Sequence, residues 1–490
     1  MSNAALTISV ADLDITSCYR ILLIVLIGEK DDVMPLNENT ESAVAAARYL
    51  KEVMQGNVAL PGDGAYESGR KVWNSAIDHH PALIAFCETI KDIQMAVRAA
   101  SLHSIPLSVR SRGHDWTGRS VRADGCVIDL SRMDLVTVDA EKKIATVAAG
   151  ASAAAVIAAA APHGLVPVTG WHSVVGMAGL ILGGGYGPLI ASHGLALDSL
   201  VGAEVILADE RRVVANASEN PDLFWAIRGG GGNFGIIASM QVRLYPLREL
   251  LAGTIIFPLS EAKAVLAGYA KMMSASAFDT LSVVIGIFPG PEGHPVLMLA
   301  PAWTGDRAQG EEVITSLQQL GTPIYAQFGP MTYGDMIGSF DARVVDGHHH
   351  ALQTRSVPKL SLEVISAIVG AGSNRTSPLS AIVLQHFRGA CTRVPLEATA
   401  FGLRQEHVMV EIIAAWEPGA THNGAEHKQW ARNLSEALAP LALPGGYPNI
   451  LGPGDVDQIA HAYGSNLQKL QRVKERLDPS YILSGTLLPT

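Results

Sequence analysis

The spacing of apolar residues predicts helices and strands in alternation along most of the chain. Thr40–Met54 has apolar positions at helical spacing and predicts an amphipathic helix. Short apolar runs at Ala82–Phe86 and Ile105–Val109 predict two strands, and the segment between them, Ile90–His103, predicts a helix. We therefore expect a βαβ unit in this part of the chain.

Further elements follow from the same patterns. Short runs rich in apolar residues predict strands at Cys126–Leu130, Leu135–Val138, Ile144–Val147, Val201–Leu207, Ile236–Leu244, Leu281–Phe288, Val296–Thr304, Leu379–Gln385 and His407–Trp416. Helices are predicted at Ala151–Ala161, Asp222–Ile227 and Asp455–Leu477. The strands become longer after about residue 250 and alternate with helices, which indicates an α+β sheet domain in the second half.

Charge and composition narrow the class of protein. The 490 residues include 36 Lys and Arg against 46 Asp and Glu, a formal net charge of −10, and 48% of them are hydrophobic. Such a chain is too apolar to be disordered. It is also a poor candidate for nucleic-acid binding, which needs clustered cationic side chains at the phosphates. Its length allows two to three domains.

One long segment has no charged residue. From Ile144 to Leu197, 54 residues contain no Asp, Glu, Lys or Arg, whereas a charged fraction of 17% would give about nine. Val174–Ala191 within it holds six glycines and Pro188, which argues against a lone helix in lipid. Ile21–Ile27 is too short for a span and lacks the flanks of a signal peptide. We therefore expect no membrane segment.

The cysteines and a histidine run give no convincing metal or disulfide site. Cys18, Cys87, Cys126 and Cys391 have no paired spacing, which is typical of reduced thiols in a cytoplasmic protein. The run His348–His350 would place two imidazoles on one side of a strand, but no third ligand has suitable spacing. We expect no metal and a surface or pocket-lining loop at these histidines.

Two glycine clusters, Gly176–Gly187 and Gly229–Gly235, are candidates for phosphate binding, because glycine lets backbone amides approach an anion. The second contains GxGxxG at Gly230, Gly232 and Gly235. A predicted helix precedes this motif and a strand follows it, the reverse of the order in a Rossmann dinucleotide site. No Walker lysine follows either cluster, which excludes a P-loop. Tight turns and close packing are the simpler alternative.

The charge-free segment suits a cofactor that joins a diphosphate to a flat apolar ring. A diphosphate bound without Lys or Arg needs backbone amides, helix N-termini and hydroxyls. A flavin ring needs a dry slot, although a plain buried core would have the same composition. The turn Arg110–Gly118, which follows a predicted strand and contains His114 among small residues, is a candidate second anchor.

Six segments occur in order along the chain: RSRGHDWTG, VTGWHSVVGMAG, LGGGYG, HGLALDSLVGAEVILAD, NPDLFWAIRGGGGNFGI and YGSNLQKLQRVKERLDPSY. Together they resemble the berberine-bridge-type FAD-linked oxidases of the vanillyl-alcohol oxidase / p-cresol methylhydroxylase superfamily. VTGWH and LFWAIRGGGGNFGI favour the single-covalent branch that includes 6-hydroxy-D-nicotine oxidase.

The resemblance implies an α+β, two-domain fold with a PCMH-type FAD-binding part and a substrate domain built on an antiparallel sheet. Residues 1–56 would be an N-terminal extension and residues 57–250 the FAD-binding domain. Residues 251–445 would form the substrate-binding domain, and residues 446–490 would return to the FAD-binding domain.

The resemblance also implies FAD bonded through the ring of His114. The link would be single, because His172 stands where doubly linked members have Cys. Arg112 replaces a usual glycine of the motif, and Asp198 is expected to fix a loop. The expected cofactor contacts are Arg110, Ser111, Arg112, Gly113, Asp115, Thr169, Gly170, Val175, Gly176, Gly179, Gly183, Gly184, Gly185, Tyr186, Gly187, Gly235, Ile237 and Asn449.

The implied chemistry is removal of a hydride from a C–H next to an alcohol or amine, with electrons passed to O2 to give H2O2. Candidate bases are Tyr447, His172 and His386, in that order. Val175 stands where, in this family, Val accompanies reactivity with oxygen. We expect a small-molecule substrate and O2 as partners, and a homodimer as a candidate assembly. The alternatives are a flavin dehydrogenase with another acceptor and a non-catalytic flavin-binding protein.

Overall fold

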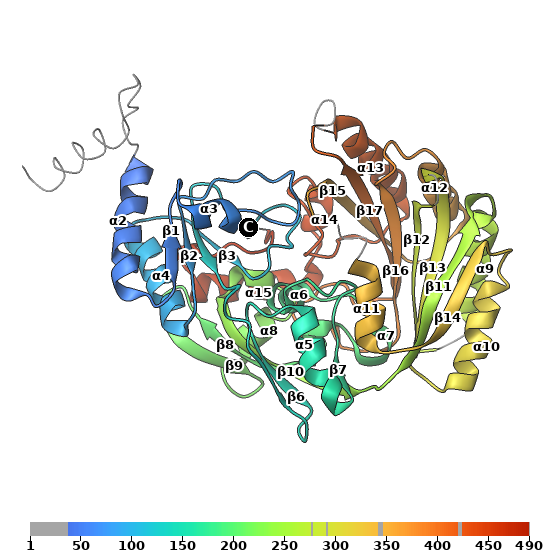
Figure 1. The fold of residues 1–490 in the computed structure, drawn as a ribbon, viewed down its shortest axis with the longest axis horizontal. Coiled ribbons are helices and arrows are strands. Elements are labelled where there is room, and N and C mark those ends of the chain that lie inside the picture. The colour runs from blue at the N-terminus through green and yellow to red at the C-terminus, as the bar shows by residue number, and fades with distance from the viewer. Residues whose placement is uncertain (1–37, 276–277, 291–292, 342–345, 420–423, 490) are drawn as a thin grey trace, which may run out of the picture.

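The computed structural model describes residues 38–275, 278–290, 293–341, 346–419 and 424–489. Most of the predicted N-terminal extension, with Cys18 and Ile21–Ile27, lies outside the described residues. The described chain forms three sheets with helices around them (Figure 1). The expectation of an α+β fold is confirmed.

The first sheet has four strands in the order β1-β2-β4-β3. The strands are β1 (Asn57–Ala59), β2 (Leu83–Phe86), β3 (Leu107–Arg110) and β4 (Cys126–Asp129), with helices α2 (Glu38–Val53), α3 (Gly64–Gly69) and α4 (Ile90–Leu102) around them. Strands β2 and β3 both pair with β4 in parallel. The predicted βαβ unit is therefore present, with β4 inserted between its two strands.

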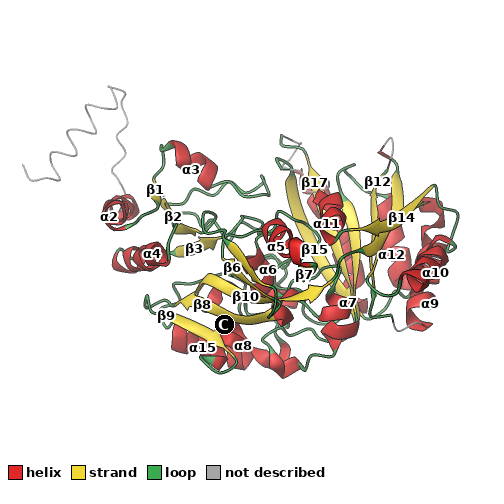
Figure 2. Cartoon of the chain, turned by 60° about the horizontal axis from the view of Figure 1, so that its bottom comes forward, coloured by secondary structure: helices red, strands yellow, loops and turns green. Residues whose placement is uncertain are grey.

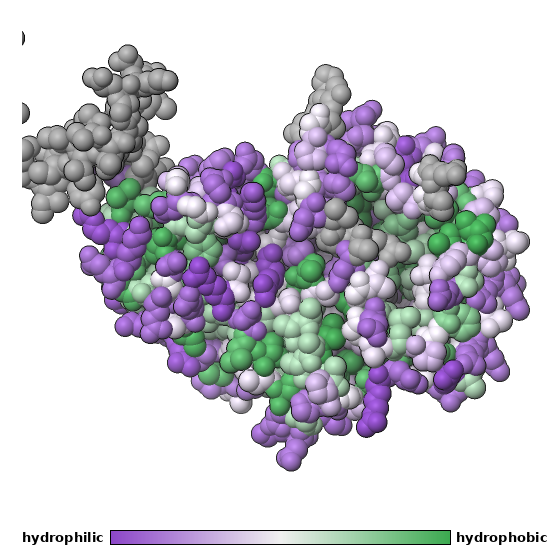
Figure 3. Space-filling view, in the orientation of Figure 1, coloured by the Kyte–Doolittle hydropathy of each residue, from purple (hydrophilic) through white to green (hydrophobic). Residues whose placement is uncertain are grey.

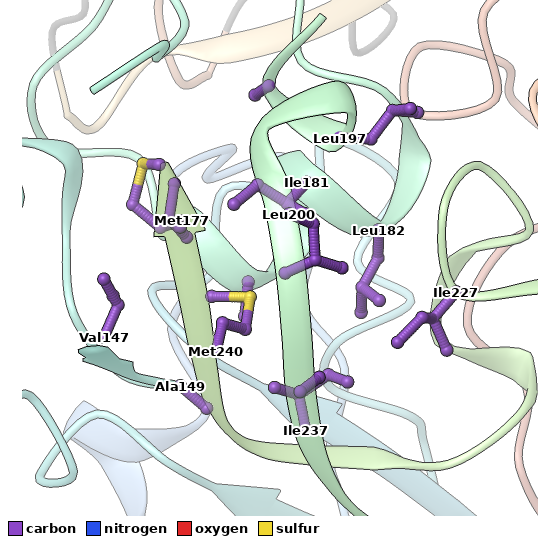
Figure 4. Close-up of a cluster of buried hydrophobic side chains, with 14 of the residues drawn as sticks. Val147, Ala149, Met177, Ile181, Leu182, Leu197, Leu200, Ile227, Ile237 and Met240 are labelled. Carbon is purple, nitrogen blue, oxygen red and sulfur yellow. The ribbon is translucent and has the colours of Figure 1, made fainter. Parts of the chain in front are cut away.

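The second sheet is antiparallel and has the order β5-β6-β10-β8-β9, with β7 paired to β10. Its strands are β5 (Val136–Asp139), β6 (Ile144–Ala148), β7 (Leu165–Pro167), β8 (Leu200–Ile206), β9 (Arg212–Asn216) and β10 (Ile236–Pro246). Short helices connect them: α5 (Ala153–Ala160), α6 (Met177–Gly183), α7 (Ile190–His193) and α8 (Pro221–Ala226). Met177 and Ile181 of α6 share a core with Leu200 of β8 and Met240 of β10 (Figure 4).

The third sheet has seven antiparallel strands in the order β14-β11-β13-β12-β16-β17-β15. They are β11 (Leu250–Pro258), β12 (Leu281–Pro289), β13 (Pro295–Trp303), β14 (Tyr325–Met331), β15 (His349–Val357), β16 (Ala381–Phe387) and β17 (His407–Trp416). The helices are α9 (Ala262–Ala275), α10 (Arg307–Gln318), α11 (Tyr333–Asp341), α12 (Leu362–Ser373) and α13 (Ala425–Leu438). Helices α9, α10 and α12 cover the outer face of this sheet, and α11 lies on its inner side (Figures 1 and 2).

The two faces of the third sheet belong to two different cores. On β17, Val408, Val410 and Ile412 join the core under the outer helices. Met409, one position out of phase, joins the core shared with the first two sheets. Because side chains alternate along a strand, odd-numbered residues of β17 face the first two sheets. This inner face is where the two halves of the molecule meet. On the side shown in Figure 3, hydrophilic residues are widespread and apolar residues form several separate patches between them.

The predicted helix Asp455–Leu477 is wrong as a single element. The structure has a short α14 (Val456–Ile459), a turn, and then α15 (Leu467–Leu477). Gly464 in the turn has φ +50°. The amide of Asn466 donates to the carbonyls of Leu396 and Thr399, and this tertiary contact fixes the break.

Candidate active site

The loop that contains His114 follows β3 and is tied down by charged residues on both sides. The Arg110 guanidinium lies 3.0 Å from the buried Asp129 carboxylate. Asp115 accepts hydrogen bonds from Thr117 and Arg119 and so organises the next turn. Burial lowers the pKa of His114, which keeps its imidazole neutral. A neutral imidazole has the free lone pair that a nucleophilic nitrogen requires.

Two other residues of this loop have protein partners. The Ser111 hydroxyl donates to the carbonyl of Ala149 at 2.6 Å. Arg112 lies 3.6 Å from Asp134 in an ion pair. The buried Nε of Arg112 has no partner among the described residues, so this N–H is available to an anion.

The first glycine cluster separates into packed and open positions. A Cβ at Gly184 would lie 2.7 Å from the Tyr447 ring, and one at Gly183 would collide with the Asn449 amide. Gly179, by contrast, has nothing within 4 Å of its would-be Cβ. The close-packing alternative therefore holds for Gly183 and Gly184, and the surface at Gly179 is open to a bound group.

The second glycine cluster packs against other parts of the chain. A Cβ at Gly231 would collide with Thr486, and one at Gly229 with the backbone of Phe401. One at Gly235 would collide with Val205. Ile237 is buried in the core (Figure 4). Close packing explains the glycines here, which leaves only backbone groups for a cofactor.

The remaining predicted cofactor contacts line the same region. Thr169 is buried and shares a hydrogen bond of 2.8 Å with the Tyr333 hydroxyl of α11. Its neighbour Gly170 precedes Trp171. Val175 accepts from the Ala153 amide at 2.9 Å. Gly176 begins α6 against Ser111, and Gly187 approaches the Thr169 carbonyl. The charge-free segment thus lies directly beside the His114 loop.

Buried polar atoms without a partner show whether this region fits FAD. In the described part of the chain, these include Trp73 Nε1, Arg110 Nε, Arg112 Nε and Ser120 Oγ, all at or beside the His114 loop. Such donors suit the phosphate oxygens or polar ring edge of a bound cofactor. Residues on the facing charge-free segment add no competing charge. The residues present therefore fit FAD.

Across from this region, the inner face of the third sheet holds an acid that the sequence analysis missed. Protein surrounds most of the Glu411 side chain on β17, but a part of its surface remains accessible. Burial raises its pKa to about 7, and a hydrogen bond from Gln385 partly offsets this effect. Cross-strand from Glu411 on β15 is Thr354, whose buried hydroxyl has no partner among the described residues.

Tyr447 lies close to this acid. Its hydroxyl oxygen accepts hydrogen bonds from the Gly185 amide and from the Asn449 side chain, each at 2.9 Å. Burial raises the pKa of Tyr447 to about 12, against the lowering effect of these two bonds, and the nearby Glu411 raises it further. The phenol therefore stays protonated at neutral pH, with its own proton available for donation.

Tyr186 stands next to Tyr447, with ring centroids 4.7 Å apart. Its hydroxyl lies 3.0 Å from His407 Nε2, while His407 Nδ1 is 2.7 Å from the Gln405 carbonyl. With Nδ1 as the donor, Nε2 accepts the Tyr186 proton. Burial lowers the pKa of His407 to about 4, so this imidazole is neutral.

The other two predicted bases lie in different surroundings. His172 lies in the loop after Trp171, with Nδ1 4.0 Å from the Asp341 carboxylate at the end of α11. His386 alternates with Gln385 on β16 and faces the outer side, where it pairs with Glu406 at 3.1 Å and borders Tyr269 of α9. The structure brings Tyr447, Asn449 and Glu411 together and leaves His386 on the opposite face.

Asp198 fixes a loop, as expected. Its carboxylate accepts the Leu195 amide at 2.8 Å and two bonds from Arg404, each 2.8 Å. Both carboxylate oxygens are thereby engaged in holding the chain after α7.

The histidine run begins β15 and joins the two halves of the molecule. The Asn74 side chain bonds the His350 backbone at both its amide and its carbonyl. The His350 ring stacks on Trp73 at 4.3 Å. Among the described residues no group of three or more His, Cys, Asp or Glu is arranged to hold a metal. Within the same residues, no helix has the length and apolar character to cross a membrane.

The unpartnered polar atoms around the His114 loop and the acid on the facing sheet suit a cofactor-dependent oxidoreductase. Residues 81–216 match the FAD binding domain family. The (R)-6-hydroxynicotine oxidase of Paenarthrobacter nicotinovorans is 29% identical over 451 residues, which cover 87% of this chain and 94% of that protein. The FAD-linked oxidoreductase YgaK of Bacillus subtilis (strain 168) is 28% identical, with 88% and 96% covered.

Solved structures agree with the sequence relatives. 6-Hydroxy-D-nicotine oxidase from Arthrobacter nicotinovorans matches with a TM-score of 0.80 at 27% identity, over 89% of this chain and 97% of that chain. A berberine bridge enzyme variant matches in fold with a TM-score of 0.81 at 21% identity, over 91% and 99%. The chain is an enzyme that is similar in sequence and fold to FAD-linked oxidoreductases and oxidases. The alternative of a non-catalytic flavin-binding protein is thereby set aside.

Proposed function

We propose that this enzyme is an oxidase acting on a small organic alcohol or amine, with O2 as the electron acceptor and H2O2 as the product. The observation that carries the proposal is Glu411, an enclosed acid on the inner sheet face whose pKa of about 7 suits proton transfer at neutral pH. Its side chain is connected through Gln385 to Trp171 of the charge-free segment.

Each residue has a distinct role in this proposal. FAD, when bound, supplies the acceptor for the substrate hydride. Glu411 accepts the proton from the substrate O–H or N–H. Tyr447 donates its hydroxyl proton to orient the substrate heteroatom, because two N–H groups already occupy its oxygen. His172 is the second candidate base, supported by its position beside Asp341.

The residues around the cofactor support a single covalent link through His114. The neutral imidazole of His114 is a competent nucleophile, and His172 occupies the place of a second attachment residue. Acid precipitation tests the link, since a covalent flavin stays with the pellet. We expect His114→Ala to release all the yellow colour to the supernatant while the circular dichroism spectrum is retained. Colour released from the wild-type protein would contradict the link.

The acceptor and the substrate need separate measurements. A screen of amines, alcohols and sugars for peroxide production would identify the substrate class. Anaerobic bleaching of the flavin followed by exposure to air then tests the acceptor. Fast reoxidation supports the oxidase, in line with Val175. Slow reoxidation with rapid transfer to a dye would favour the alternative, a flavin dehydrogenase.

The division into domains is also proposed here: residues 57–250 with 446–490 form the cofactor-binding domain, and residues 251–445 form the substrate-binding domain. The return of the C-terminal segment is supported by the Trp116 indole, which donates to the Ile450 carbonyl at 2.8 Å. Lys474, which bonds the Asn233 carbonyl at 2.8 Å, supports it as well. A cytoplasmic location is supported by the cysteines of the described residues, Cys87, Cys126 and Cys391, which are buried and free. The homodimer stays a prediction.

A further inference from the structure

Gln385 joins two residues from opposite sides of the candidate active site. Its Oε1 accepts a hydrogen bond of 3.0 Å from the Trp171 indole N–H, and its Nε2 donates to Glu411 at 2.7 Å. Gln385 is almost completely buried, and its strand neighbour Val383 packs with the core on the same inner face. The three side chains form a continuous chain of hydrogen bonds from the charge-free segment to the third sheet.

The indole decides which end of the Gln385 amide meets the acid. An indole nitrogen can only donate, so Oε1 must face Trp171. If the amide turned over, two N–H donors would oppose each other at Trp171, and Oε1 would oppose the Glu411 carboxylate. Both contacts would be repulsive. Trp171 therefore holds Gln385 in the orientation that donates to Glu411.

Trp171 is itself held by the helix on the inner face of the third sheet. Phe340 of α11 contacts the Trp171 ring edge to face at 5.1 Å. Asp341 accepts hydrogen bonds from both the amide and the hydroxyl of Ser173. The segment that presents the indole is thus fixed from two sides, and the position of its N–H is defined.

We propose that Gln385 is a positioning residue, which stabilises the Glu411 carboxylate through its amide N–H and is held in that orientation by the Trp171 indole. The inference rests on the proposed function only in the role it gives Glu411. Gln385 touches neither the reacting atoms nor the cofactor in this role. Its effect is to keep the acid available as a base at neutral pH.

The two phenols and the buried imidazole near Glu411 change their charge well away from neutral pH. Tyr447 and Tyr186 face it from the cofactor side, and burial raises the pKa of both phenols. His407 borders Tyr186 and has a pKa of about 4. His172 and Asp341 lie further along the Trp171 loop and α11. A signal specific to a carboxyl group distinguishes Glu411 from these phenols and imidazoles.

Infrared difference spectroscopy of the holoenzyme during a pH titration gives that signal, because a protonated carboxyl has a carbonyl band that a carboxylate lacks. Glu411→Gln assigns the band by removing it. We expect Gln385→Leu to raise the midpoint of the Glu411 titration by about one to two pH units, since a hydrogen bond to the charged form is lost. Trp171→Phe should raise it by a smaller amount, because the amide is then free to turn. Gln385→Met repeats the first change with an unbranched side chain.

Trp430→Phe is the matched control. Its indole also donates to a single acceptor, the Ala371 carbonyl at 3.0 Å, but on the outer face of the sheet. It should leave the midpoint unchanged. An unchanged midpoint in both Gln385 variants would overturn the proposal, and an unchanged midpoint in Trp171→Phe would overturn the part played by the indole. The titration needs no substrate. If Glu411→Gln removed the band yet left oxidation intact, the proposed base would fail and the role of Gln385 would stand.

Discussion

The charge-free segment and the inner face of the third sheet meet in this enzyme but differ in how they use polar groups. The charge-free segment, Ile144–Leu197, contributes backbone and small side chains, and its glycines allow other residues to approach closely. The inner face of the third sheet instead buries polar groups in an apolar frame, with Gln385, Glu411 and Thr354 on neighbouring strands. A surface that binds a permanently charged diphosphate can rely on fixed dipoles. A surface that moves protons needs a group whose charge can change.

The largest effect is expected when the acid on the inner face of the third sheet is replaced. Glu411→Gln keeps the shape and the hydrogen-bonding capacity but cannot accept a proton. We expect kcat to fall by about 10²- to 10⁴-fold, the usual contribution of a general base, with the flavin spectrum retained. Steady-state peroxide production with the substrate found by screening measures it. A kcat within a factor of two of wild type would show that another group, with His172 the first candidate, takes the proton.

The next largest effect is expected at a closely packed glycine of the charge-free segment. Gly184 has φ +151°, and a Cβ there would lie 2.7 Å from the Tyr447 ring. We expect Gly184→Ala to lower the free energy of unfolding by about 1–3 kcal/mol through strain and overpacking.

Gly179→Ala is the matched control within the same cluster. Gly179 lies inside α6 with open space around its would-be Cβ, so alanine should raise stability by up to about 1 kcal/mol. Urea unfolding of the two variants measures the difference. If both lost stability equally, the distinction between packed and open glycines would be wrong.

A smaller effect concerns stability as a function of pH. The pKa of Glu411 is about 7 in the folded protein against an ordinary 4.5, so the folded state holds this proton more tightly. The associated stability is complete below pH 4.5, falls as the pH rises and is lost above about pH 7. The total is at most about 3 kcal/mol. The Glu411→Gln variant has no carboxyl at this position and so lacks this pH-dependent stability.

The difference in unfolding free energy between wild type and Glu411→Gln separates the contribution of Glu411 from that of other titrating groups. His350 and His407 act in the opposite direction, because burial lowers the pKa of each to about 4 and stability is lost as the pH falls from 6.5. The wild type should lose stability relative to the variant between pH 5 and pH 8. A constant difference across that range would contradict an enclosed, proton-binding Glu411.

Local patterns were enough for most of the fold. The strands at Ile236–Leu244 and His407–Trp416 are predicted close to their observed bounds because each carries a strand pattern, alternating in the first and mostly apolar in the second. The helix Asp455–Leu477 failed because Asn466 bonds carbonyls about seventy residues away, a contact that no local pattern contains. The β15 strand is missed because polar residues, among them His350, Thr354 and Ser356, occupy its buried positions, where a local pattern requires apolar ones.

Sequence by itself determined the cofactor side of this protein. The order of the motifs, the His114 turn and the absence of charge from Ile144 to Leu197 are properties of contiguous residues. Tertiary structure decided the chemistry on the facing side. Glu411 is a single acidic residue in an apolar strand, and only the pairing of β15, β16 and β17 shows that it faces inward beside Gln385 while His386 faces out. The physical reason is that a side chain's pKa depends on what encloses it, and that enclosure is built from segments far apart in the chain.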